Sequence, residues 1–192
     1  MSTSSAPSSP APSTIFIGFF VASSAALAIV FAFQYGLGLM PCVLCVWQRA
    51  PHALAILIAG VGIGQARAVD PIRYPFRAMP WPTLTVVAGL LLLDHLFNAG
   101  LAAFHVGVEQ HWWAGTEACT GGAPVGLTAE QLGARLLDTK PARCDEIPWS
   151  LFGVSLAGFN LLLSLALAAA AAWAALRFNA ERISQARAKA RR

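Results

Sequence analysis

The sequence contains very little charge. Only 11% of its 192 residues are charged, 57% are apolar, and the mean hydropathy is +0.61. An average soluble domain carries about 25% charged residues, which it needs to cover its surface with polar groups. The small charged fraction therefore excludes a water-soluble globule and predicts an integral membrane protein. From Met1 to Gln48 there is no charged residue at all.

The N-terminus also lacks the features of a removed targeting segment. Residues 1–14 are mainly Ser, Ala, Pro and Thr, without the Lys or Arg that begins a secretory signal. A lipoprotein cleavage site at Cys42 is disfavoured because Pro41 occupies the position where a small residue is required. We therefore expect residues 1–14 to be a disordered tail that is kept.

Uncharged runs long enough to cross a bilayer occur four times. A membrane-spanning helix needs about 20 apolar residues. The runs predict an all-α four-transmembrane-helix bundle over residues 15–176, with spans at about 15–34, 50–66, 83–104 and 153–176. External loops then cover residues 35–49 and 105–152, and residues 177–192 form a basic tail. Residues 147–153 are expected to form an interfacial entry to the fourth span.

The basic residues predict the orientation of the bundle. Of the thirteen Lys and Arg residues, nine lie in the second connection or in the C-terminal tail: Arg67, Arg73, Arg77, Arg177, Arg182, Arg187, Lys189, Arg191 and Arg192. Cytoplasmic loops collect Lys and Arg, so both termini are expected in the cytoplasm. In a bacterial inner membrane the other two loops would then face the periplasm. The basic tail suits an anionic lipid surface, and we expect no nucleic-acid partner.

The second external loop contains a helix signal. The segment Thr128-Ala129-Glu130-Gln131 fits a capping box, and Leu127 with Leu132 fits the accompanying hydrophobic staple. Leu132 and Leu136 then follow at helical spacing. We expect a short amphipathic helix on the membrane surface, between Cys119 and Cys144.

All four cysteines fall in the two external loops, with Cys42 and Cys45 in the first. A zinc site normally takes two closely spaced cysteine pairs, whereas Cys119 and Cys144 are far apart in the sequence, so we expect no metal. Ordinary structural disulfides suit Cys119 and Cys144. They suit the Cys-x-x-Cys pair badly, because so short a loop constrains almost no chain entropy. Such tight pairs are more often redox-active.

Two polar side chains near the cysteines are candidates for chemistry. Arg49 lies one turn beyond Cys45, where a fixed cation would lower the pKa of a thiol. The alternative is an arginine that only reaches the membrane interface. His105 shares a helical face with Asp94 and Asn98 and lies near the outer end of its span, where it could relay a proton. We interpret Asp94 and Asn98 as polar packing between helices.

The combination of these features resembles the DsbB family of quinone-linked disulfide oxidases. The resemblance rests on Pro41-Cys42-Val43-Leu44-Cys45 followed by Gln48-Arg49, on four spans, and on a second external loop with Cys119 and Cys144. It covers residues 15–176. It implies that a Cys119–Cys144 disulfide oxidises a periplasmic DsbA-like thioredoxin-fold protein. It also implies that Cys42 and Cys45 reoxidise this disulfide and pass electrons to ubiquinone or menaquinone.

The same resemblance implies individual roles. Cys45 would contact the quinone, Arg49 would bind a ring oxygen, and Cys42 would exchange with the second-loop cysteines. A histidine near the quinone is also implied at the outer end of the third span. His105 and His111 are both candidates, and we assign His105 because it still belongs to the helix. The Asp94-His95 pair inside the span is not part of the family pattern.

Two other classes remain open. An enzyme similar to vitamin K epoxide reductase also pairs quinone chemistry with Cys-x-x-Cys in a small bundle, but its loop cysteines precede that motif. The other class is a non-enzymatic membrane scaffold or transporter subunit with structural disulfides. Reactivity separates this class from the enzymes, because structural disulfides would resist mild reductant and would not turn over with quinone.

Overall fold

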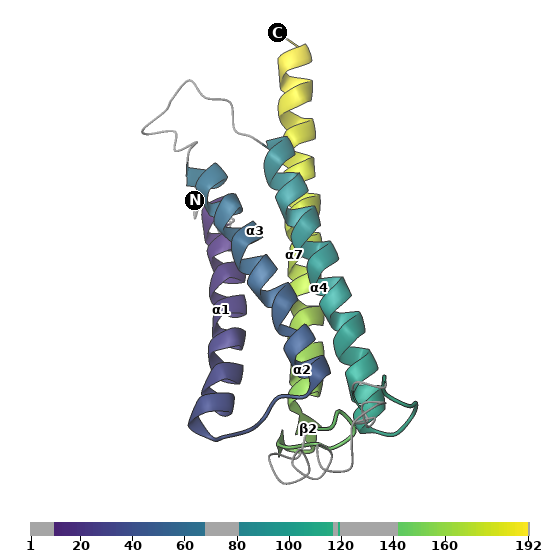
Figure 1. Ribbon diagram of the computed structural model, residues 1–192. Helices are drawn as coiled ribbons and strands as arrows, with labels where there is room; N and C mark the ends of the chain where they lie inside the picture. Colours follow the sequence, from purple (N-terminus) through teal and green to yellow (C-terminus); the bar gives the residue numbers. More distant parts are fainter. Residues whose placement is uncertain (1–9, 68–80, 117–118, 120–141, 192) are drawn as a thin grey trace, which may run out of the picture.

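The computed structural model describes residues 10–67, 81–116, 119 and 142–191, and in these residues four long helices form a bundle (Figure 1). The long helices are α1 (Pro12–Gly36), α3 (Arg49–Arg67), α4 (Trp81–Glu109) and α7 (Leu156–Ala190). A short helix, α2 (Val43–Trp47), leads into α3, and the two together form one segment of spanning length. All four segments are long and apolar enough to cross a membrane. The predicted all-α four-helix membrane bundle is confirmed.

Helix α1 begins earlier than expected, at Pro12. Proline is well tolerated in the first turn of a helix, because its missing N–H would have no partner there. The C-terminal end of the helix is closed by the Leu37 N–H, which donates to the Phe33 carbonyl at 3.2 Å. Gly38 follows with a φ of +68°, a left-handed conformation that glycine adopts without steric penalty. The chain can therefore turn from α1 toward α2.

Helices α4 and α7 both extend beyond their predicted ends. Helix α4 continues to Glu109, so His105 is helical, as the choice of His105 over His111 assumed. Helix α7 begins at Leu156, where the Ser155 hydroxyl oxygen accepts a hydrogen bond from the Gly158 N–H at 3.1 Å. It then continues to Ala190, so most of the predicted basic tail is helical and prolongs the last span.

A small β-hairpin precedes α7, where an interfacial entry was expected. Strands β1 (Ser150–Leu151) and β2 (Val154–Ser155) pair antiparallel around a two-residue turn. Phe152 and Gly153 in this turn have φ values of +51° and +79°. Positive φ at both central residues is typical of a type I′ turn, which matches the twist of paired strands. The fourth long helix accordingly starts at Leu156 and not near residue 153.

The bundle packs as two helix pairs. Helix α4 lies along α7, α1 lies along α3, and α3 contacts α4. A buried apolar cluster, here called the inner core, fills the half of the bundle away from the cysteines, with Phe16, Phe19, Leu84, Leu91 and Phe178 among its largest members. Small residues such as Ala55, Ala59, Ala171 and Ala174 belong to the same cluster. Small side chains let the backbones of membrane helices approach closely.

The two ends of the bundle differ. The start of α1 and the end of α7 lie at one end, whereas α2 and the hairpin lie at the other, here called the cysteine end (Figure 1).

The predicted capping box at Thr128–Gln131, the amphipathic helix, and the arginines at 73 and 77 lie outside the described residues. Their structure stays a prediction.

Candidate active site

The Cys-x-x-Cys pair lies at the start of α2. Cys42 is the residue that caps this helix, and its sulfur accepts a hydrogen bond from the Cys45 N–H at 3.3 Å. The two sulfur atoms are 3.0 Å apart, and both cysteines are free thiols. A helix N-terminus favours negative charge, because its first N–H groups have no partners within the helix. The local fold therefore favours the thiolate form at Cys42.

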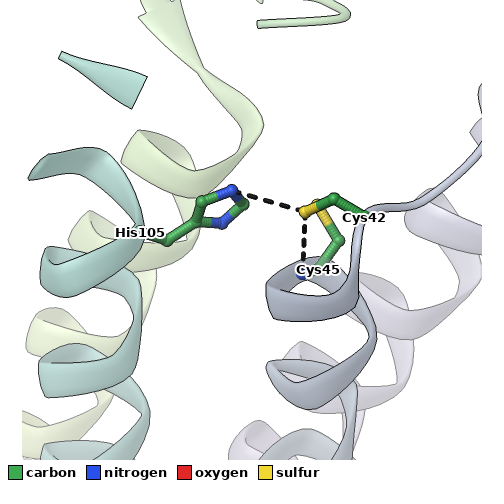
Figure 2. A group of neighbouring side chains, drawn as sticks. All are labelled: Cys42, Cys45 and His105. Carbon is green, nitrogen blue, oxygen red and sulfur yellow. Dashed lines mark hydrogen bonds between the residues drawn. The ribbon is translucent and has the colours of Figure 1, made fainter. Parts of the chain in front are cut away.

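His105 brings a second helix to this pair. Its ring is buried, with 2% of the residue exposed, and it points from α4 toward Cys42 (Figure 2). The Nε2 atom lies 3.5 Å from the Cys42 sulfur, and Nδ1 lies 2.7 Å from the Gln48 side-chain nitrogen. An amide nitrogen only donates, so Nδ1 accepts and the proton of the neutral ring is on Nε2. His105 thus directs an N–H group at the Cys42 sulfur.

Gln48 has this orientation because of a further partner. Its side-chain oxygen accepts a hydrogen bond from the Asn160 side-chain nitrogen at 2.6 Å, which leaves the Gln48 nitrogen facing His105. Asn160 comes from α7, Gln48 from the junction of α2 and α3, and His105 from α4. Three helices therefore set the tautomer of one imidazole.

The pKa of the Cys42 thiol is lowered by its neighbours. The largest contribution is the hydrogen bond from the Cys45 thiol, which stabilises a thiolate at Cys42. The imidazole of His105 lowers the pKa further, whereas burial acts in the opposite direction. Glu109 lies one turn beyond His105, with a carboxylate oxygen 3.9 Å from Nε2, and the same carboxylate accepts a hydrogen bond from the Ser155 hydroxyl. Arg49 was expected to act on the Cys45 thiol, but its guanidinium donates to Gln34 instead.

The second cysteine pair lies against the first. Cys119 and Cys144 form a disulfide, and both are buried. They belong to one buried cluster with Cys42, Leu44 and Val108, and Cys45 packs against that cluster. Cysteines from two loops far apart in the sequence thus meet at one place.

A cavity opens beside Cys45, on the side of α1. Its apolar wall includes four α1 side chains, Ala26, Leu27, Val30 and Phe33. The other wall is polar and is formed by Cys45, Gln48, Arg49, His52, His105 and Asn160. Small-molecule sites commonly combine an apolar lining with a few placed polar groups.

Arg49 lies at this cavity but is not bonded to Cys45. Its guanidinium donates to the Gln34 side-chain oxygen at 2.7 Å and lies 4.9 Å from the centre of the Phe31 ring. Both of these partners belong to α1. The guanidinium of Arg49 has one buried donor, Nε, without a hydrogen-bond partner among the described residues.

The polar stripe on α4 continues deeper into the bundle. Asn98 donates to the Ser164 hydroxyl at 3.0 Å and lies 3.3 Å from the Asn160 side-chain oxygen. His52 Nε2 lies 2.8 Å from that same oxygen. The contacts of Asn98 are those expected for interhelical polar packing. Asp94 and His95 are buried, and among the described residues Asp94 Oδ2 and both His95 ring nitrogens have no partner.

Comparison with known proteins gives a consistent result. The sequence matches the family described as disulfide bond formation protein DsbB over residues 12–174. The chain belongs to the DsbB family. A relative named disulfide bond formation protein B, from Stutzerimonas stutzeri (strain A1501), is 27% identical over 173 residues, which cover 86% of this chain and 96% of the relative. No solved structure matches the chain significantly.

Membership of the DsbB family, with four helices of spanning length, makes this protein a multi-pass membrane protein of disulfide bond formation. The structure brings Cys42, Cys45 and His105 together, and it places Arg49 at the same cavity. His111 lies after the end of α4, with a φ of 58°, and is exposed.

Four further polar residues that were not predicted from the sequence lie at this site: Gln48, His52, Glu109 and Asn160. Gln48 and His52 occupy positions i and i+4 of a segment in which Arg49 is the only charged residue before Arg67. Asn160 and Ser164 repeat that spacing in the last span. Polar residues at this spacing in a membrane helix mark a face that turns to the interior. That signal was present in the sequence.

Proposed function

We propose that this protein is a thiol:quinone oxidoreductase. It reoxidises a periplasmic thioredoxin-fold dithiol oxidase of the DsbA type and passes the electrons to a membrane quinone. One observation carries the proposal: Cys42 shares a buried cluster with Cys119 and Cys144, while Cys45 lines the cavity. A cysteine pair in this position can exchange disulfides on one side and deliver electrons on the other.

The first half of the reaction is disulfide exchange. A thiolate of the partner attacks one sulfur of Cys119–Cys144, and the second thiol of the partner resolves the mixed disulfide. The released loop thiolate attacks the sulfur of Cys42 in an oxidised Cys42–Cys45 pair, and Cys45 leaves as a thiolate. The other loop cysteine then displaces Cys42 and re-forms Cys119–Cys144.

His105 supports this exchange through Cys42, whose sulfur is the last leaving group. Its Nε2 faces Cys42, so the ring stabilises the thiolate that forms there. A stabilised thiolate is a better leaving group, which favours re-formation of the loop disulfide. Glu109 is 3.9 Å from the same ring atom and stabilises the ring when it is protonated. His105 is therefore assigned to the exchange step, besides lining the cavity.

The second half of the reaction requires an electron acceptor, and the cavity suits a quinone. Its apolar wall of α1 side chains suits a ring and the start of an isoprenoid chain. Its polar lining includes Cys45 together with Arg49 and His52, each of which has one buried polar atom without a partner among the described residues, Arg49 Nε and His52 Nδ1. When bound, ubiquinone or menaquinone supplies a two-electron acceptor. Cys45 would contact the ring, and Arg49 and His105 would hold it in place.

The same proposal fixes the orientation in a bacterial inner membrane. Arg67 ends α3 at the end of the bundle away from the cysteines, and the basic last turns of α7 project from that end (Figure 1). Lys and Arg collect on the cytoplasmic side, so both termini would be cytoplasmic. The cysteine end would then face the periplasm, where disulfides persist.

The proposal is tested by reconstituting the relay. Purified protein is mixed with a reduced thioredoxin-fold dithiol oxidase and a short-chain ubiquinone, and quinone absorbance is followed together with the thiol content of the partner. We expect two partner thiols to be lost for each quinone reduced, with Cys45→Ser protein as the inactive control. Partner oxidation without quinone reduction, or no catalysed oxidation at all, would overturn the assignment.

A further inference from the structure

His52 is a buried residue of the cavity that the relay described above does not use. It lies on α3, one turn deeper than Arg49, and only 4% of the residue is exposed. Both residues line the cavity. An ionisable side chain inside a membrane span is expensive to bury and most often serves function.

The two ring nitrogens of His52 have different environments. Nε2 lies 2.8 Å from the Asn160 side-chain oxygen and 3.3 Å from the Asn98 side-chain nitrogen, whose hydrogens also have Ser164 and Asn160 as acceptors. The Asn160 side-chain oxygen is the acceptor end of the amide, because the Asn160 nitrogen donates to Gln48 at 2.6 Å. Nε2 therefore carries a hydrogen, while Nδ1 is buried and has no partner among the described residues. A buried nitrogen without a partner is unfavourable unless a ligand or water completes it.

A second atom in the same cavity shares this property. Arg49 Nε is also buried without a partner among the described residues, three positions before His52 on the same helix. Residues three apart in a helix lie on one face, about 4.5 Å apart along the axis. The two residues that hold these buried polar atoms both line the cavity, beside apolar side chains of α1, and a ring that carries oxygens would offer partners to both.

We propose that His52, protonated at both ring nitrogens when the quinone is bound, donates its Nδ1–H to the second ring oxygen of the quinone and gives it that proton during reduction, while Arg49 holds the first. This inference rests on the proposed function. In the step, Cys42 and Cys45 lose two electrons as their S–S bond forms, and the ring oxygens take up two protons. His52 provides one proton from Nδ1 and is reprotonated by one of the two protons that the thiols release. Two thiols and one quinone thus become one disulfide and one hydroquinone.

Asn160 makes His52 suited to this role. The Asn160 side-chain oxygen accepts a hydrogen bond from Nε2–H and so holds that proton in place. The proton that His52 can exchange is therefore the one at Nδ1. Three other charged or titratable side chains line the cavity beside this ring: Arg49, Cys45 and His105. A fourth, His95 on α4, has its ring centre 6.2 Å from that of His52. Among the described residues, α1 and α7 contribute only uncharged side chains to the cavity.

Two substitutions separate the two nitrogens. The side-chain nitrogen of Gln reaches the position of Nε2, so His52→Gln keeps the bond to Asn160 and removes Nδ1. The side-chain nitrogen of Asn reaches the position of Nδ1, so His52→Asn keeps a donor for the quinone but cannot give up a proton. His95→Phe is the matched control, because it also removes a buried imidazole of the same cluster but does not line the cavity.

The test combines equilibrium quinone binding with single-turnover reduction. Binding of a short-chain ubiquinone is measured by equilibrium dialysis, and reduction of the bound quinone is followed in pre-reduced protein between pH 5 and 9. We expect His52→Gln to weaken binding about tenfold and to slow reduction about 100-fold, in the range known for loss of a general acid. His52→Asn should bind within about threefold of wild type yet reduce quinone as slowly as His52→Gln. His95→Phe should match wild type in both assays.

The outcomes separate this inference from the proposed function. Wild-type binding and an unchanged pH profile in His52→Gln, while Cys45→Ser protein remains inactive, would overturn the role of His52 and leave the relay intact. Absence of quinone reduction by the wild-type protein would overturn both. Exchange between reduced partner and Cys119–Cys144 should be unaffected in both His52 variants, and a loss of exchange together with a lowered melting temperature would assign His52 a structural role instead.

Discussion

The Nε2 atom of His105 lies 3.5 Å from the sulfur of Cys42, although the two residues are 63 positions apart in the sequence. The contact joins the outer end of α4 to the first residue of the Cys-x-x-Cys motif (Figure 2). Because Gln48 holds the other ring nitrogen, the N–H group of His105 faces the sulfur and not the solvent. The cysteine proposed to exchange with the second loop thus contacts a buried side chain of the bundle.

The first prediction concerns this contact. His105→Phe should raise the pKa of Cys42, because it removes the imidazole that stabilises the thiolate. A lowered pKa keeps the thiolate populated at lower pH, so the midpoint of alkylation should move to higher pH, by about one unit, in the variant. The rate of Cys42 alkylation in reduced protein is measured against pH by mass spectrometry. His111→Phe, at an exposed position outside the site, should leave the midpoint in place.

The second prediction concerns the first cysteine pair. Cys42→Ser or Cys45→Ser should abolish quinone reduction and leave the protein inserted and folded, because cross-linking so short a loop adds little stability. Quinone absorbance gives the activity, and the melting temperature in detergent gives the stability. A fall in melting temperature of more than a few degrees in both variants would assign the pair a structural role.

The third prediction concerns the loop disulfide. Cys119→Ser should block oxidation of the partner protein but leave Cys42 and Cys45 able to equilibrate with quinone, since the loop pair faces the partner in the proposed relay. The redox state of Cys42 and Cys45 after addition of quinone is read by thiol trapping. Normal partner oxidation by the Cys119→Ser protein would show that the proposed order of exchange is incorrect.

The fourth prediction concerns Arg49. Arg49→Lys should weaken apparent quinone affinity several-fold and Arg49→Gln more severely, because a lysine lacks the planar fork that can bond Gln34 and keep Nε for the ring oxygen. An arginine that only reaches the interface would tolerate lysine. Steady-state kinetics with varied quinone distinguish the two roles. An unchanged KM in Arg49→Gln would leave Arg49 as a membrane anchor, and exchange with the partner should be normal in both variants.

Much of the fold could be predicted from the sequence, because a bilayer restricts the possibilities. Runs of uncharged residues predicted four spans, since backbone polar groups in lipid must be satisfied within helices. The ends of the spans were less accurate. Helix α4 continues five residues past its predicted end, and α7 continues through the basic tail, because neither segment contains a proline. Hydropathy measures where a segment leaves the lipid, which is not where its helix ends.

The candidate site was predicted only in part. The cysteines, Arg49 and His105 could be named because their residue types carry recognisable chemistry. Gln48 and Asn160 could not be assigned roles, because an amide has no chemistry of its own and acts here by orienting a histidine from another helix. The partner of Arg49 was also missed: Gln34 lies 15 positions away across a turn whose geometry depends on Gly38. Contacts of this kind depend on packing angles that a single sequence does not specify.

The inner core has a consequence for membrane energetics. It fills the half of the bundle opposite the cysteines with buried apolar side chains from α1, α3, α4 and α7. Every group assigned to exchange or to proton transfer lies on the cysteine side of the inner core. The thiols would therefore release their protons, and the acceptor would take up its protons, on the same side of the bundle. Moving one elementary charge against a potential of 100 mV requires about 2.3 kcal/mol. Turnover that moves no charge across the bilayer would neither draw on nor add to the transmembrane voltage, and its rate would be the same in energised and de-energised vesicles.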